Sequence, residues 1–151
     1  FWVEIEAIAA DTPTPTATAT ATATNTTSSP DFLLSYQNFH DCGSPGSSYA
    51  TTKVENIGSV AFESVYITIE DIDASPVKTL YSGSNDTPFL SDPNNCPPEA
   101  SALASGNVAY IAASIGSSPT SGNKVRETLK MCTEDGLGGD CVTKQVEFDI
   151  P

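Results

Sequence analysis

"TTKVENIGSVAFESVYITIEDID", residues 51–73, contains two runs of alternating apolar and polar side chains on either side of Asn56-Ile57-Gly58. Alternation with a period of two predicts β-strands, and an Asn-x-Gly sequence between them predicts a turn. The positions that face the same way along the two predicted strands, 48–58 and 64–72, are Ala50, Thr52, Val54, Val65, Ile67 and Ile69. This stretch therefore predicts a sheet with one buried face.

The chain outside this stretch shows the same pattern. The further segments predicted as strands are 32–39, 77–81, 107–115, 125–132 and 141–150. Clusters of Gly, Pro, Asn, Asp and Ser separate them, residues 133–140 are expected to form a hairpin loop, and residues 98–106 are expected to form one helical turn at most. Short strands at this spacing predict an all-β sandwich of about seven strands over residues 31–151.

Two segments of different character precede the predicted sandwich. Residues 1–10 alternate as a strand does and carry the large apolar side chains of Phe1, Trp2, Val3, Ile5 and Ile8. Residues 11–30 are nearly pure Thr, Ala and Pro, a composition that cannot build a core. We expect this linker to be extended and polyproline-like, spanning about 60 Å.

The linker is also the predicted site of covalent sugars. Dense Thr with Pro is typical of O-glycosylated stalks. The candidate O-glycosylation residues are Thr12, Thr14, Thr16, Thr18, Thr20, Thr22, Thr24, Thr26 and Thr27. Asn25 and Asn85 each begin an Asn-x-Thr acceptor sequence for N-glycosylation.

Four cysteines indicate an oxidising compartment. They stand at 42, 96, 132 and 141, with no Cys-x-x-Cys pair, and the only histidine is His40, so the spacing does not predict a zinc site. Three pairings are formally possible; the spacing favours Cys132–Cys141, leaving Cys42–Cys96. An even cysteine count favours disulfides, and therefore an extracellular, cell-surface location. There is no apolar run long enough to span a membrane, and Glu4 and Glu6 interrupt any signal-peptide core, so we expect a mature chain whose leader has been removed.

Charge and residue content argue against several classes of function. The 19 acidic residues outnumber the 6 basic ones, giving a net charge of −13, which disfavours binding to nucleic acids and anionic membranes. His40 lies beside Asp41, at a strand end, and we expect it to be a surface or capping residue. Glu70, Asp71 and Asp73 are expected to be a solvated strand end, and neither 70–76 nor 134–140 matches an EF-hand loop. We therefore expect no enzyme activity, no metal and no cofactor.

Residues 51–73 resemble the Ig-like surface modules of the CARDB-like kind, which carry a strand, an Asn-x-Gly turn and a second alternating strand. The resemblance covers about residues 31–151 and implies that the all-β sandwich is an Ig-like β-sandwich with an extracellular scaffolding or adhesion role. The arrangement of a loose N-terminal strand, a linker and a β-sandwich is similar to filament subunits that polymerise by donor-strand insertion.

The long linker favours one hypothesis over the others. A strand that folds back on its own sheet needs two to five linking residues, whereas here residues 11–30 intervene. We therefore expect residues 1–10 to add to the sheet of a neighbouring copy, which makes a head-to-tail homopolymer. The alternative is a stalked adhesin or carbohydrate-binding module, and a small secreted hydrolase lacks a catalytic constellation.

Overall fold

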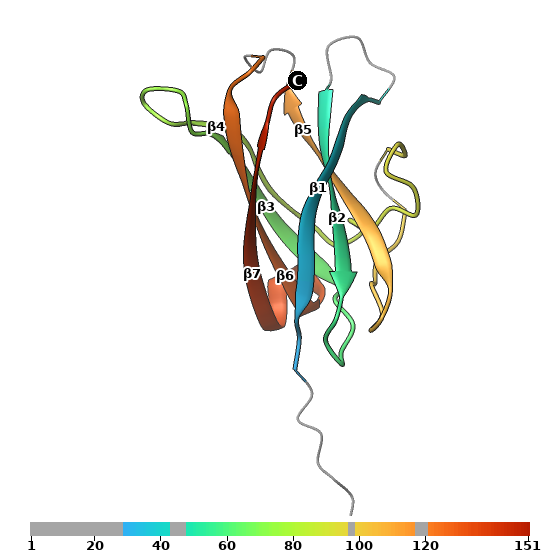
Figure 1. Ribbon diagram of the computed structural model, residues 1–151. Helices are drawn as coiled ribbons and strands as arrows, with labels where there is room; N and C mark the ends of the chain where they lie inside the picture. Colours follow the sequence, from blue (N-terminus) through green and yellow to red (C-terminus); the bar gives the residue numbers. More distant parts are fainter. Residues whose placement is uncertain (1–28, 43–47, 97–98, 117–120) are drawn as a thin grey trace, which may run out of the picture.

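The computed structural model describes residues 29–42, 48–96, 99–116 and 121–151, which form strands and a single 3₁₀ turn (Figure 1). In chain order the elements are β1 (Phe32–Asp41), β2 (Ser48–Asn56), β3 (Ser64–Asp71), β4 (Lys78–Asn85), β5 (Val108–Gly116), β6 (Lys124–Glu134), η1 (Asp135–Leu137) and β7 (Gly138–Asp149). No helix among these residues is long and apolar enough to cross a membrane.

The strands build two antiparallel sheets. One has the order β1-β2-β5 and the other the order β4-β3-β6-β7. The prediction of an all-β sandwich of seven strands is confirmed. β1 and β7 border one side of the sandwich, and β4 and β5 border the other.

The core lies between the two sheets and is built from the alternating positions of each strand. Val65, Ile67 and Ile69 of β3 are buried, as the alternation of residues 64–72 predicts. Phe32 of β1 meets Phe62 edge to face, with ring centroids 5.7 Å apart. Tyr36 and Phe148 stack at 4.4 Å and close the core between β1 and β7.

Two loop expectations need correction. The hairpin loop predicted over 133–140 is shorter, because β6 continues to Glu134 and β7 begins at Gly138. Residues 99–106 form no helical turn; instead, Ala100 and Leu103 make isolated β-bridges to Phe89 and Phe62. Backbone pairing to the sandwich therefore replaces the local helical turn. β4 is also longer than the predicted 77–81, since it extends to Asn85.

The crossover between β4 and β5 covers one sheet edge. Leu90 and Tyr110 exchange backbone hydrogen bonds of 2.8 and 2.9 Å, so this segment pairs with the outer edge of β5. Phe89 and Leu90 are both buried there. The crossover is therefore part of the sandwich.

The described chain enters and leaves the sandwich at opposite ends. In Figure 1, β1 begins at the lower end, and the C-terminus lies at the upper end. The β6–β7 hairpin shares the lower end with the start of β1.

Candidate functional sites

The outer face of β1 and β2 carries a shallow hollow. It has a volume of about 380 Å³ and is lined by Leu33, Leu34, Ser35, Lys53 and Glu55. Leu33, near the start of the edge strand β1, is 52% exposed and supplies apolar surface to this hollow. β1 pairs only with β2 among the described residues, so the hollow lies beside a strand edge that has no partner there.

The side of the sandwich between β1 and β7 is closed by an ion pair. Lys144 of β7 points inward, and its Nζ lies 2.7 Å from Asp31 Oδ1. The same ammonium lies 5.5 Å from the centroid of the Phe32 ring. The hydrogen bond from Lys144 lowers the pKa of the Asp31 carboxyl. An inward-pointing lysine on an edge strand is a common way of preventing unwanted strand addition.

The Asn56-Ile57-Gly58 turn holds the segment through which the linker joins the domain. The Asn56 side chain is fully buried; its Nδ2 donates to Val60 O and Leu103 O at 2.8 and 2.9 Å. Its Oδ1 accepts the Gly58 N–H at 3.0 Å, which fixes the turn. The N–H groups of Ile57 and Gly58 both donate to Asp31 O.

Gly58 is required by this close approach. A Cβ built at position 58 would lie 2.5 Å from Asp31 N and 2.6 Å from Ser29 O. Ser29 and Ser59 also exchange two hydrogen bonds: Ser59 N–H donates to Ser29 O, and Ser29 N–H donates to Ser59 Oγ. The last residues of the predicted linker are thus fastened to the β2–β3 turn.

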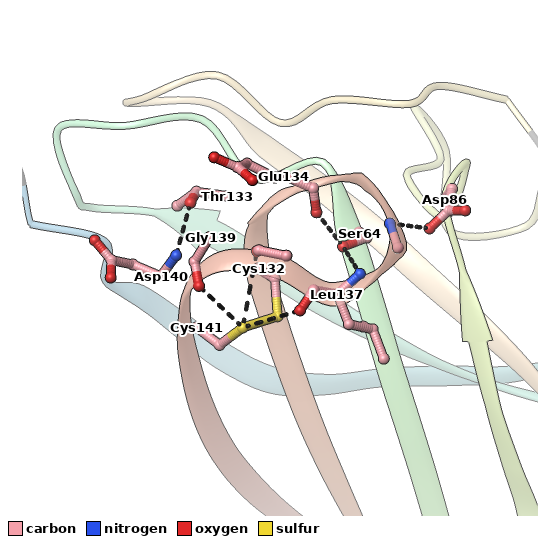
Figure 2. Close-up of a disulfide and its surroundings, with 11 residues drawn as sticks. Ser64, Asp86, Cys132, Thr133, Glu134, Leu137, Gly139, Asp140 and Cys141 are labelled. Atoms are coloured by element: carbon pink, nitrogen blue, oxygen red, sulfur yellow. Dashed lines mark hydrogen bonds between the residues drawn. A yellow bond between two sulfur atoms is a disulfide. The ribbon is translucent and has the colours of Figure 1, made fainter.

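The structure joins Cys132 to Cys141 and Cys42 to Cys96, the two pairs that the spacing favours. Cys132 and Cys141 are directly opposite each other on β6 and β7. The hairpin tip folds over this bond (Figure 2), and the carbonyl oxygens of Leu137 and Gly138 lie 3.8 and 4.0 Å from Cys141 Sγ.

The hairpin tip is fastened to β3 through one buried serine. Ser64 Oγ donates to Glu134 O at 2.6 Å and accepts the Leu137 N–H at 3.0 Å (Figure 2). Leu137 has a φ of 65°, a left-handed conformation that is uncommon for leucine. The serine thus fixes the one residue of the turn whose backbone is strained.

His40 lies against the other disulfide, at the far end of β1. Its Nε2 is 3.2 Å from Asn95 O and 3.4 Å from Cys42 Sγ, and its Nδ1 is 3.2 Å from Thr51 Oγ1. His40, Cys42 and Cys96 form the one cluster of metal-ligand type found in the described part of the chain. Both sulfurs are engaged in the disulfide, so neither is available as a thiolate ligand.

Two of the carboxylates expected at a solvated strand end, Asp71 and Asp73, accept hydrogen bonds that hold neighbouring loops in place. Asp71 is buried. Its Oδ1 accepts hydrogen bonds from the N–H groups of Asp73 and Ala74, and its Oδ2 accepts one from Asn123 Nδ2 at 2.8 Å. Asp73 Oδ2 accepts the Lys124 N–H at 2.8 Å. The solvated reading is therefore wrong for Asp71, whose oxygens hold the β3–β4 loop against the start of β6.

Glu127 is a buried acid that sequence reasoning missed. It faces the core from β6, is 1% exposed, and accepts a hydrogen bond from Thr52 Oγ1 of β2 at 3.0 Å. Burial raises the pKa of its carboxyl to about 8. The alternation of residues 125–132 already places Glu127 on the same face as Val125, Leu129 and Met131, so the signal was present in the sequence.

Of the residues predicted for glycosylation and strand insertion, only Asn85 lies in the described part of the chain. Asn85 ends β4, is half-buried, and its Oδ1 accepts the Thr87 N–H at 2.8 Å. The predicted polymerisation strand, the candidate O-glycosylated threonines and Asn25 lie outside the described residues. These expectations stay predictions.

No family model matches the chain, and no curated protein matches it. Among solved structures, a β-glucosidase from Kluyveromyces marxianus is 12% identical, with a TM-score of 0.32, over 81% of this chain and 14% of the enzyme. β-Glucosidase 3B from Thermotoga neapolitana in complex with α-D-glucose is 12% identical, with a TM-score of 0.30, over 78% of this chain and 17% of the enzyme. This chain thus spans less than a fifth of either enzyme, and similarity at this level carries no argument about its function.

Proposed function

We propose that this chain is a structural subunit of an extracellular, glycosylated filament or surface appendage. In this proposal residues 1–10 of one copy add as a strand to the sheet of the next, and no cofactor or catalysis is involved. The observation that carries the proposal is the outer edge of β1, which has no partner strand among the described residues and is bordered by the hollow at Leu33. An extended peptide that adds to such an edge gains main-chain hydrogen bonds, and pockets for alternate side chains give specificity.

The other three edges are less suited to accept a strand. The edge of β5 is paired with Leu90. β7 carries the inward-pointing Lys144 next to Asp31. The exposed positions of β4 are polar, as in Ser82 and Ser84. The first half of β1, before the register shift between Tyr36 and Asn38, is the remaining acceptor.

The N-terminal segment has side chains that suit this edge. Its alternation would place Val3 and Ile5 on the inner face, beside the half-buried Leu34. Glu4 would then lie on the outer face, on the same side as Lys53. Burying large apolar side chains contributes about 1.5–3 kcal/mol each, which favours insertion over exposure to water.

The place where the linker joins the domain also suits a head-to-tail contact. The linker joins the sandwich at Ser29–Asp31 and is held there by the Asn56–Gly58 turn. From this end an extended linker reaches away from its own domain, which favours a neighbour over its own β1 edge. Head-to-tail contacts of this kind do not close on themselves and generate a fibre.

The first test compares the full chain with a chain that lacks residues 1–10. We expect filaments of the full chain in negative-stain electron microscopy and a monomer on deletion, and a synthetic peptide of residues 1–10 should bind the shortened chain. Leu33→Asp should abolish peptide binding, because it places a charge in the hollow. Val77→Asp, at a residue that is 55% exposed and distant in sequence from β1, is the matched control.

A monodisperse monomer in both cases would overturn the filament proposal. Glycan binding by that monomer would favour the stalked adhesin or carbohydrate-binding module. Filaments that survive Leu33→Asp but not the deletion would keep the donor strand and move its acceptor away from β1.

A further inference from the structure

His40 directs a proton donor at one sulfur of the Cys42–Cys96 disulfide. Asn95 O can only accept a hydrogen bond, so His40 Nε2, at 3.2 Å from it, carries a hydrogen. The same N–H group lies 3.4 Å from Cys42 Sγ. The Thr51 hydroxyl at Nδ1 completes the ring's hydrogen bonds and fixes its orientation.

The two cysteine residues of this bond differ in exposure. Cys96 is exposed in the β4–β5 crossover, whereas Cys42 and His40 are half-buried. An attacking thiolate therefore reaches Cys96 more easily than Cys42. The sulfur that would leave, Cys42 Sγ, is the one beside the imidazole N–H. Stabilisation of the leaving thiolate accelerates thiol–disulfide exchange.

We propose that the Cys42–Cys96 bond is a thiol-exchange site at which an external thiolate attacks Cys96. The incoming sulfur forms a new S–S bond with Cys96 Sγ, and the Cys42–Cys96 bond breaks. Its electron pair stays on Cys42 Sγ, which accepts the His40 Nε2–H hydrogen bond. One thiolate is consumed and one is released, so no separate oxidant or reductant is needed. The product is this domain linked to a thiol through Cys96.

The second disulfide lacks both features. Its exposed sulfur is Cys141, and attack there would leave a thiolate on Cys132, which is fully buried. Burial disfavours an anion. The atoms around Cys141 Sγ are carbonyl oxygens of Leu137, Gly138 and Gly139, which repel negative charge. The Cys132–Cys141 bond therefore serves as an internal control for exchange.

The charge around the site selects the kind of thiol. Asp41 precedes Cys42, and the crossover that carries Cys96 contains Asp92 and Glu99. There is no Lys or Arg between residues 79 and 123. A thiol without negative charge is therefore the preferred substrate, and the preference should weaken as added salt screens the acidic groups.

The test treats the full chain with cysteamine under native conditions, quenches the reaction at timed intervals with excess iodoacetamide, and locates the products by mass spectrometry. We expect cysteamine on Cys96, carbamidomethyl on Cys42, and an intact Cys132–Cys141 bond. 2-Mercaptoethanesulfonate, compared at equal thiolate concentration, should react several-fold more slowly at low salt. A cysteine-containing decapeptide, neutral apart from its thiol, tests whether a peptide thiol also reaches Cys96.

The role of His40 is tested by two variants. His40→Leu should slow the exchange at least about fivefold, the rate equivalent of one hydrogen bond to the leaving sulfur. His40→Gln restores an N–H donor and should recover part of the rate. Adducts on Cys42, equal labelling of both sulfurs, or earlier opening of Cys132–Cys141 would each overturn the proposal. The product pattern of the wild-type chain gives this answer even if a His40 variant misfolds.

Discussion

At the level of single residues, Glu127 links the stability of the fold to pH. Its carboxyl has an ordinary pKa of 4.5 and a pKa of about 8 in the folded protein. Between these values the folded chain binds one proton more than the unfolded chain, so the free energy of unfolding decreases as pH rises. The expected slope is at most about 1.4 kcal/mol per pH unit, and it disappears above pH 8. Glu127→Gln, which keeps an oxygen for Thr52, should remove this slope.

Urea unfolding at intervals between pH 5 and pH 8 measures this effect. Glu70→Gln, on β3, is the matched control and should keep the wild-type slope. Equal pH dependence in the wild type and Glu127→Gln would show that Glu127 is not protonated in the folded core.

At the junction between the linker and the domain, the backbone of Ser29–Asp31 lies so close to Gly58 that a larger side chain does not fit. Gly58→Ala would press a Cβ against Asp31 N and Ser29 O, and both are backbone atoms that cannot rotate away. We expect a loss of about 1–3 kcal/mol in the free energy of unfolding, together with faster proteolysis near residue 29. In Gly83→Ala the new Cβ meets only the end of the Tyr81 side chain, so stability should change less. Equal effects of the two substitutions would argue against a close-packed junction at Gly58.

At the level of elements, the strands could be predicted because burial on one face leaves a period of two in the sequence. β2 and β3 follow from this pattern, and Asn56 and Gly58 mark the turn between them. Lys144 and Glu127 interrupt the apolar pattern of their own strands. Their partners, Asp31 and Thr52, lie far away in the chain, so sequence spacing could not identify them.

The crossover and the hairpin tip also depend on contacts between distant segments, which sequence spacing could not predict. The bridges that Phe89 and Leu90 make to Ala100 and Tyr110 are contacts between distant segments with no local pattern. The spacing of Cys132 and Cys141 predicted a hairpin, but not that Ser64 of β3 would hold its tip. Local chemistry determined the strands, and tertiary contacts determined the lengths of the loops.

A substitution at Ser64 measures how much its two hydrogen bonds to the hairpin tip contribute to stability. Ser64→Ala removes the donor to Glu134 O and the acceptor of the Leu137 N–H in a buried position. We expect a loss of about 1–3 kcal/mol, with increased amide hydrogen exchange at residues 135–137. Ser82→Ala, which removes an exposed hydrogen bond to Tyr66 Oη, is the matched control and should cost less. Unchanged exchange at the tip in Ser64→Ala would mean that the disulfide alone holds it.

At the level of the whole molecule, the two disulfides constrain very different lengths of chain. Cys42 and Cys96 are 54 residues apart, and their bond ties the end of β1 to the crossover that covers β5. Cys132 and Cys141 are 9 residues apart, in a hairpin already paired along most of its length. In the chain-entropy model the first bond stabilises the fold by about 4 kcal/mol and the second by about 2.5 kcal/mol.

Replacing each pair by alanine tests this difference across the whole fold. The Cys42→Ala, Cys96→Ala chain should unfold at a lower temperature than the Cys132→Ala, Cys141→Ala chain in calorimetry, because its unfolded state regains more freedom. Alanine is used because serine would place a hydroxyl at the fully buried position of Cys132. Urea m-values should rise more for the first variant, since a longer loop of the unfolded chain becomes accessible to solvent. The reverse order of melting temperatures would mean that the cross-strand bond is the principal covalent support of the sandwich, with the crossover held by its backbone pairing to β5.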